Sequence, residues 1–125
     1  MKKVIATDKA PAAVGAYSQA IQYNGLLFTS GQIPIDPATG NVLTGDIKEQ
    51  AAQVMNNIGA ILAEAGVDFS AVLKTTIFLN DINDFAAVNE VYQSYFSEAF
   101  PARSCFEVAN LPKGVGLEIE AIAAL

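Results

Sequence analysis

The strand-forming segments of this chain carry apolar side chains on both faces, and this pattern restricts the folds that the chain can adopt. Successive side chains of a strand point to opposite faces of a sheet. Leu26 and Phe28 therefore share one face, while Leu27 takes the other. Ile119 and Ile122 also lie on opposite faces of their segment. A sheet with one face in water would alternate more cleanly. We therefore expect helices to cover one face and further copies of the chain, in a closed homo-oligomer, to cover the other.

The composition agrees with extensive burial. Apolar residues make up 52% of the 125 residues and charged residues only 16%, which is unusually apolar for a small protein. A chain of this length suits one domain with a single core, and no linker rich in Ser, Pro, Gly or charge divides it. We expect a single domain that spans residues 1–125.

The first half of the chain predicts a hairpin followed by a helix. Segment 18–35 holds two β-prone runs around Asn24 and Gly25, a dipeptide that is typical of a two-residue hairpin turn. Apolar residues then recur at helical spacing between Asp46, which resembles a helix cap, and Gly66, a typical residue beyond a helix end.

The second half predicts a strand, a helix and a second hairpin. Segment 71–81 is rich in β-branched residues, and a helical stripe runs from about Asn83 to Ala99. Segments 102–110 and 115–124 are expected to be the last two strands, paired with each other. The order of elements predicts an α+β fold with two helices laid on one face of the sheet.

Charge and residue usage exclude several classes of function. The net charge is −6, the sequence pI is about 4.4 and no basic run occurs, so a nucleic-acid partner is not expected. Histidine is absent, which removes Ser-His and Cys-His nucleophilic pairs and histidine-based zinc sites. Residues 10–35 carry no charge, but prolines, glycines and amides interrupt them too often for a membrane span. A lone cysteine fits a cytoplasmic protein.

Arg103 is the residue that most needs an explanation. In a strand from Ala102 onward it shares a face with Cys105. An arginine among apolar neighbours costs several kcal/mol to bury unless a carboxylate meets it. Two partners remain open. One is an internal ion pair with Glu118 or Glu120 on the strand expected to lie next to it, and the other is the carboxylate of a small ligand, held by two parallel hydrogen bonds.

Four segments together resemble one protein family. They are "APAAVGAYSQA" at 10–20, "FTSGQIPIDPATG" at 28–40, "VLKTTIFLNDINDFAAVNEVY" at 72–92 and "PARSCFEVANLPKGVGLEIEAIA" at 101–123. They are similar to the signature of the Rid family, also called YjgF, of enamine/imine deaminases. The resemblance implies a chorismate-mutase-like fold and a homotrimer, in which three sheets form a central β-barrel with the helices outside and the active sites at the subunit clefts.

The resemblance also implies an activity. Members of this family hydrolyse reactive 2-imino acids, such as 2-iminobutanoate and 2-iminopropanoate, to 2-oxo acids and ammonia. These imines arise from dehydratases that use pyridoxal phosphate (PLP), and their removal prevents damage to PLP enzymes. The reaction needs no metal or cofactor, because an imine carbon is already electrophilic and a positioned base suffices to bring in water.

The same resemblance implies roles for individual residues. The carboxylate-binding arginine of the family falls on Arg103, and its water-positioning glutamate falls on Glu118 rather than Glu120. The other positions that the resemblance places in the pocket are Tyr17, Ser30, Gly31, Asn89 and Cys105. One departure is Ala16, which stands where relatives commonly have a proline, so the turn before Tyr17 is expected to be looser.

These residues also have simpler interpretations. Without a histidine to act as a base, Cys105 is expected to be a buried or pocket-lining thiol rather than a nucleophile. Without the resemblance, Tyr17 would be interpreted as a packed aromatic residue. Ser30 and Gly31 would be interpreted as a bulge at a strand end. Asn89 would read as a solvent-facing helix residue, and its site role comes from the resemblance alone.

Two other functions stay open at this point. One is a ribonuclease or translation inhibitor, which the acidic charge and the absence of histidine disfavour. The other is a protein without enzymatic activity that binds small carboxylates or acts as a chaperone, which the apolar composition would also suit.

Overall fold

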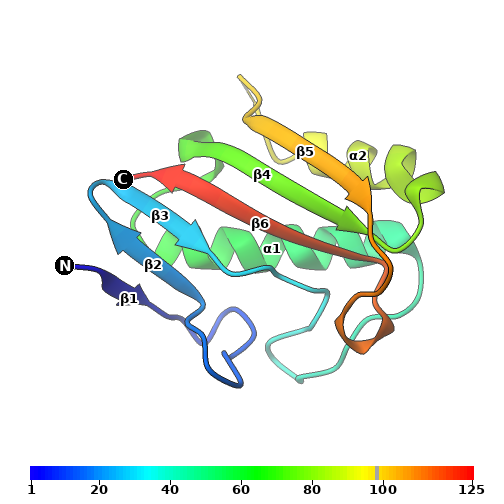
Figure 1. Cartoon of the computed structure of the whole chain (residues 1–125), viewed down its shortest axis with the longest axis horizontal. Helices are drawn as coiled ribbons and strands as arrows, with labels where there is room; N and C mark the ends of the chain where they lie inside the picture. The colour runs from blue at the N-terminus through cyan, green and yellow to red at the C-terminus, as the bar shows by residue number, and fades with distance from the viewer. Residues whose placement is uncertain (98) are drawn as a thin grey trace.

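The computed structural model describes residues 1–97 and 99–125, which form a six-stranded mixed sheet with two α-helices on one of its faces (Figure 1). The strand order is β1-β2-β3-β6-β4-β5, and only β4 and β5 run parallel. The strands are β1 (Lys3–Ile5), β2 (Ala20–Tyr23), β3 (Leu26–Thr29), β4 (Val72–Leu79), β5 (Ala102–Glu107) and β6 (Leu117–Ala124). The α-helices are α1 (Ile47–Glu64) and α2 (Phe85–Gln93), and short 3₁₀ turns cover Phe69–Ala71, Ile82–Asp84 and Pro112–Gly114. The α+β class and the placement of both helices on one face are confirmed.

The β2–β3 hairpin forms where the sequence predicts it. Its two turn residues, Asn24 and Gly25, have φ values of 50° and 75°. A two-residue turn of this kind needs positive φ at both positions, which asparagine and glycine tolerate best. Ile21 pairs with Phe28 across the hairpin, so these two apolar side chains lie on the same face of the sheet.

Helix α1 supplies most of the core beneath the sheet. It begins after Asp46, whose carboxylate accepts a hydrogen bond of 2.9 Å from the N–H of Lys48. It ends before Gly66, which has φ of 86°. The largest fully buried side chains come from α1 and from the helix-facing positions of the strands, and include Leu27, Met55, Ile58, Ile61, Leu62, Ile77, Leu79, Leu117 and Ile119.

Helix α2 is shorter than predicted. The apolar spacing predicted a helix that continues to Ala99, but α2 ends at Gln93. In the turns that follow, each backbone N–H donates a hydrogen bond to the carbonyl three residues earlier. The N–H of Phe96 donates to the carbonyl of Gln93 at 3.2 Å. The rings of Tyr95 and Phe96 pack on Phe69, with centroids 5.3 and 5.6 Å away. Aromatic packing thus stabilises a tighter turn where apolar spacing indicated helix.

The predicted pairing of the last two strands is wrong. β5 lies beside β4, parallel to it, and β6 lies on the other side of β4, between β4 and β3. Helix α2 returns the chain across the sheet after β4, so the next strand starts at the same end as β4 and must pair in parallel. Residues 108–116 then carry the chain past the end of β4 to β6. Arg103 and Glu118 therefore do not lie on neighbouring strands.

The sheet face opposite the helices carries several large apolar side chains that are open to solvent in a single chain. Phe28 on β3 and Phe106 on β5 are 41% and 45% exposed, and Val4 and Tyr23 also lie open. Phe78 packs edge-to-face on Phe106, with centroids 5.3 Å apart. The apolar pattern on both faces is confirmed, while its cover by further copies of the chain stays a prediction.

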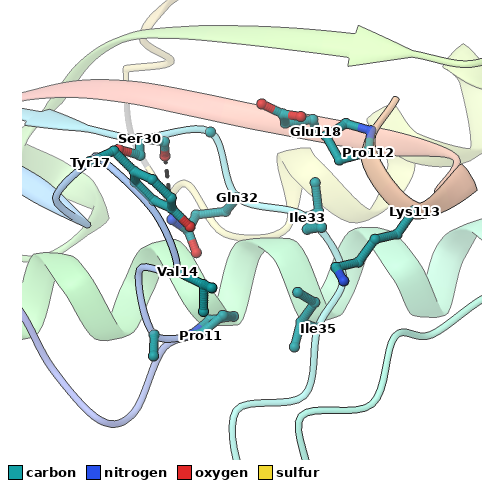
Figure 2. A pocket seen from close by; sticks show the side chains of 12 residues that line it. Pro11, Val14, Tyr17, Ser30, Gln32, Ile33, Ile35, Pro112, Lys113 and Glu118 are labelled. Carbon is teal, nitrogen blue, oxygen red and sulfur yellow. Dashed lines mark hydrogen bonds between the residues drawn. The ribbon is translucent and has the colours of Figure 1, made fainter. Parts of the chain in front are cut away.

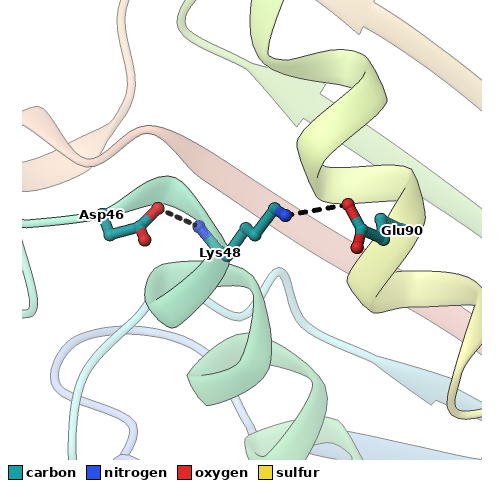
Figure 3. A network of polar contacts seen from close by, with 3 residues as sticks. All are labelled: Asp46, Lys48 and Glu90. Atoms are coloured by element: carbon teal, nitrogen blue, oxygen red, sulfur yellow. Dashed lines mark hydrogen bonds and ion pairs between the residues drawn. The ribbon is translucent and has the colours of Figure 1, made fainter.

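An ion pair joins the two helices near their outer surface (Figure 3). The ammonium of Lys48 on α1 lies 2.8 Å from the carboxylate of Glu90 on α2. The hydrogen bond and charge of Glu90 raise the pKa of Lys48. Both side chains are exposed, so solvent screens the pair and packing holds the helices together instead. Neither these helices nor any other in residues 1–97 and 99–125 is both long and apolar enough to cross a bilayer.

A buried amide connects α1 to the loop between β3 and α1. Asn57 donates hydrogen bonds to the carbonyls of Ile33 and Ile35, at 3.3 and 3.0 Å. Replacing Asn57 with alanine removes the donor of the Ile35 carbonyl and leaves the Ile33 carbonyl with the N–H of Ile35 alone, so we expect Asn57→Ala to lower the free energy of unfolding by about 1–3 kcal/mol, measured by urea denaturation. The control is Asn56→Ala, which changes the exposed neighbour. Equal losses in the two variants would contradict this account.

Candidate active site

The largest described cavity lies where three loops meet the start of β6 (Figure 2). Its volume is about 590 Å³. Four of the predicted site residues line it, namely Tyr17, Ser30, Gly31 and Glu118. The rest of the lining is mainly apolar and consists of Pro11, Ala12, Val14, Gln32, Ile33, Ile35, Pro112 and Lys113. We call this the Glu118 pocket.

Gly31 and Glu118 fit together closely in this pocket. A Cβ atom built on Gly31 would overlap the Glu118 carboxylate. Gln32 exchanges backbone hydrogen bonds with Ile119, at 2.8 and 3.1 Å, which holds the two segments side by side. A larger residue at position 31 would therefore force the Glu118 carboxylate to move from this place.

The environment of Glu118 shifts the pKa of its carboxyl above the ordinary value. Burial raises the pKa of this carboxyl, and the nearby negative charge of Glu120 raises it further. A carboxylate whose pKa is raised binds a proton more readily, which suits a group that takes a proton from water.

Ser30 holds the loop that carries Tyr17. Its hydroxyl donates to the carbonyl of Ser18 at 2.5 Å, and its N–H donates to the carbonyl of Gln19 at 2.8 Å. Tyr17 itself is 51% exposed at the rim of the pocket. Ser30 is therefore engaged in shaping the pocket, while its role in substrate binding stays a prediction.

Buried glutamines support the pocket, and sequence reasoning missed them. The Gln19 side chain donates to the carbonyl of Pro11 at 2.7 Å and accepts from the N–H of Thr7 at 2.7 Å. Gln32 is 5% exposed and donates to the carbonyl of Ser30 at 3.4 Å. The available signal was an amide in an otherwise apolar stretch, because a buried amide needs several hydrogen-bond partners.

The remaining predicted residues gather elsewhere, at the β5 edge. The guanidinium Nη1 of Arg103 donates to Oδ1 of Asn89 at 2.6 Å. A cavity of about 350 Å³ adjoins both residues, lined also by Tyr92, Gln93, Phe100 and Pro101. Cys105 is half-buried on the same face of β5. Burial raises the pKa of its thiol and the charge of Arg103 opposes this, so a reactive thiolate is not favoured.

The two groups occupy opposite faces of the sheet. Arg103 pairs in register with Thr75, which faces the helices, whereas Glu118 pairs with Phe78 on the open face. The internal ion pair that the sequence left open is therefore wrong. Among residues 1–97 and 99–125 the guanidinium meets no carboxylate, and its polar partner is the neutral Asn89.

The same described part of the chain holds no group of three or more acidic or cysteine side chains that could bind a metal ion.

Comparison with known proteins places the chain in a family. The model of the family described as Endoribonuclease L-PSP matches residues 7–125. The chain belongs to this family, which is also known as the YjgF/Rid family. The family resemblance noted in the sequence is thereby confirmed.

Individual relatives cover nearly the whole chain. A 2-iminobutanoate/2-iminopropanoate deaminase from Rattus norvegicus is 53% identical over 123 residues, which are 98% of this chain and 90% of the relative. The crystal structure of YyfA from Yersinia pestis, a Rid-family protein of unknown function, has a TM-score of 0.98 at 51% identity and full coverage of both chains. The structure of E. coli TdcF with bound serine has a TM-score of 0.94 at 45% identity, covering 98% of each chain.

The raised pKa of Glu118 predicts a pH-dependent stability difference. A carboxyl with a raised folded-state pKa contributes stability in its protonated form, and this contribution is lost as the pH rises through that pKa. Glutamine does not titrate. The free energy of unfolding of Glu118→Gln, minus that of the wild type, should therefore increase between about pH 4 and pH 7 in urea denaturation. A difference that stays constant or decreases over this range would contradict the assignment.

Proposed function

We propose that this protein is a deaminase that hydrolyses 2-imino acids, such as 2-iminobutanoate and 2-iminopropanoate, to 2-oxo acids and ammonia. The observation that carries the proposal is the state of Arg103. Its guanidinium adjoins a cavity and has a neutral amide as its polar partner instead of a carboxylate of the described chain. A fixed cation of this kind fits the carboxylate that every 2-imino acid carries.

The chemistry follows from two charged groups of opposite sign. Arg103 binds the substrate carboxylate and orients the imine carbon. Glu118 takes a proton from water while the water oxygen bonds to the carbon of the protonated imine, and the π electrons of the C=N bond move to nitrogen, which gives a tetrahedral carbinolamine. Glu118 then returns its proton to the amine nitrogen. The C–N bond breaks, the hydroxyl group loses its proton to solvent as the C=O bond forms, and ammonia and the 2-oxo acid leave. A positioned base contributes roughly 10²- to 10⁴-fold to such a step, and holding the substrate in place contributes further.

The separation of Arg103 and Glu118 within one chain requires a second copy to complete the site. We infer a homotrimer with a chorismate-mutase-like central barrel, in which the open sheet faces meet and the β5 edge of one copy approaches the Glu118 pocket of the next. The exposed Phe28 and Phe106 support this, because an apolar sheet face of this kind is normally covered. Asn89 and Cys105 would then face Tyr17, Ser30 and Gly31 across the cleft, and Tyr17 would close it.

The relatives support a small amino-acid-like ligand. Serine, which is bound in TdcF, carries a carboxylate next to a carbon that bears nitrogen, as a 2-imino acid does. The rat relative is named for the same imine hydrolysis. We propose that the chain acts in the cytoplasm on imines released by PLP-dependent dehydratases, and that it protects PLP enzymes.

A second candidate follows from the family description, which names an endoribonuclease. Against it stand the net charge of −6 and the absence of histidine, because RNA binding relies on basic side chains. A protein that only binds small carboxylates would keep Arg103 but would need no base at Glu118.

The test is a coupled assay in which a threonine dehydratase generates the imine and its decay is followed directly. Wild-type protein should speed imine decay and ammonia release. Glu118→Gln should lower kcat/KM by roughly 10²- to 10⁴-fold and remove the fall in activity at acidic pH. Arg103→Ala should abolish measurable imine hydrolysis, because the substrate is then neither bound nor oriented. The matched control is Glu120→Gln, two residues along the same face of β6, which should stay active.

Two other outcomes of this assay would favour a different function for the protein. Unchanged imine decay with wild-type protein would overturn the deaminase in favour of a binding protein. RNA cleavage that is lost in Arg103→Ala would favour the ribonuclease.

A further inference from the structure

Arg103 is held by one stripe of helix α2. Phe85, Asn89 and Tyr92 are spaced four and three residues apart and so lie on the same side of the helix. Arg103 Cζ lies 5.1 Å from the centroid of the Phe85 ring and 5.1 Å from that of Tyr92, within the range of a cation–π interaction. Asn89 accepts a hydrogen bond between the two rings along the helix.

The Tyr92 ring is itself held by a hydrogen bond of its hydroxyl group to Thr75. Tyr92 is 2% exposed and Thr75 is 3% exposed. Their hydroxyl groups share a hydrogen bond of 2.7 Å. Burial raises the pKa of Tyr92, so the hydroxyl remains protonated and is an anchor rather than an acid or base. Thr75 is also the in-register partner of Arg103 on the neighbouring strand. The β4–β5 pairing, the Thr75 hydroxyl and the Tyr92 ring therefore form a closed loop of contacts that includes Arg103, a residue that is exposed in a single chain.

This arrangement leaves the arginine able to bind an anion. A ring attracts a cation through its face, whereas a carboxylate binds to the N–H groups at the edge of the guanidinium plane. The two interactions therefore do not compete, and Asn89 uses only one of the five N–H donors. An internal carboxylate would fix the side chain equally well, but it would occupy the donors that a ligand needs.

We propose that Thr75 and Tyr92 are positioning residues: the Thr75 hydroxyl fixes the Tyr92 ring, and the rings of Tyr92 and Phe85 hold the Arg103 guanidinium in its carboxylate-binding pose before substrate arrives. A long arginine side chain otherwise loses conformational freedom on binding, and fixing it in advance lowers this cost. The role of the pose in turnover rests on the proposed deaminase function, while the pose itself does not.

Arg103 is the only arginine of the chain, so its guanidinium signals in ¹⁵N-labelled protein are assigned without further work. In ligand-free wild-type protein, the Arg103 side-chain protons should be shifted upfield by the rings, and rotation of the guanidinium should be slow. Tyr92→Leu should move these signals toward the values of a free arginine. Thr75→Val and Tyr92→Phe, which keep a ring in place but remove its anchor, should move them part of the way.

The matched control is Tyr95→Leu. It removes the same atoms three residues further along, where the tyrosine hydroxyl contacts the Ala52 carbonyl and Asn56, and it should leave the Arg103 signals unchanged. Free-arginine signals in the wild type, or an equal change in Tyr95→Leu, would overturn the proposal even if the protein is an active deaminase.

Kinetic constants distinguish a loss of Arg103 positioning from a general loss of protein stability. Tyr92→Leu should raise KM for a 2-imino acid by about 2- to 30-fold, the factor that a cation–π interaction corresponds to, and leave kcat nearly unchanged. Thr75→Val and Tyr92→Phe remove the two ends of one hydrogen bond, so their effects on KM should not add in the double variant. Additive effects, or a fall in kcat that matches the loss of stability, would overturn the proposal.

The NMR measurement and the kinetic measurement test different claims. If the wild type hydrolyses no imine, the proposed function is wrong, and the ligand-free spectra alone decide whether the rings and the Thr75 anchor hold the arginine.

Discussion

Aromatic rings hold the positive charge of Arg103, which no carboxylate among residues 1–97 and 99–125 neutralises, and the proposed site depends on this interaction. Helix α2 contributes the two rings and the amide that surround the guanidinium. An arginine paired with Glu118 would have been a structural ion pair with nothing left to recognise. Those two residues lie on opposite faces of the sheet, so Glu118 does not neutralise the cation within one chain. In the described part of the chain, the Asn89 amide takes one of its hydrogen-bond donors.

The same sheet is the basis of the proposal that a second copy of the chain completes the site. Its helix-facing side builds the core around Leu27, Ile77 and Ile119, while the opposite side stays apolar and open. Glu118 belongs to the open side, where burial and the charge of Glu120 raise its pKa. Association through the open side would cover the apolar surface and bring an arginine to the carboxylate in one step. Folding, assembly and catalysis would then share a single surface.

The sequence predicts those parts of the fold that depend on backbone preferences and on the spacing of apolar residues. The Asn24–Gly25 turn and the stripe of α1 follow from backbone preferences and apolar spacing, and the family resemblance identified Gly31 and Glu118 before their contact was visible. Strand pairing could not be read in this way. Segments 102–110 and 115–124 look like a hairpin, and only the crossover through α2 places β4 between them. The three-residue strand β1 was also missed, because so short a segment carries no period.

The most direct test is to mix two inactive variants, Arg103→Ala and Glu118→Gln, dissociate them and let them reassemble. If each site combines the arginine of one copy with the glutamate of another, random mixed oligomers should regain activity in roughly a quarter of their sites, because some interfaces then contain both native residues. If both residues must come from the same chain, no mixture can restore imine hydrolysis. An inactive mixture that has demonstrably exchanged subunits would contradict the account.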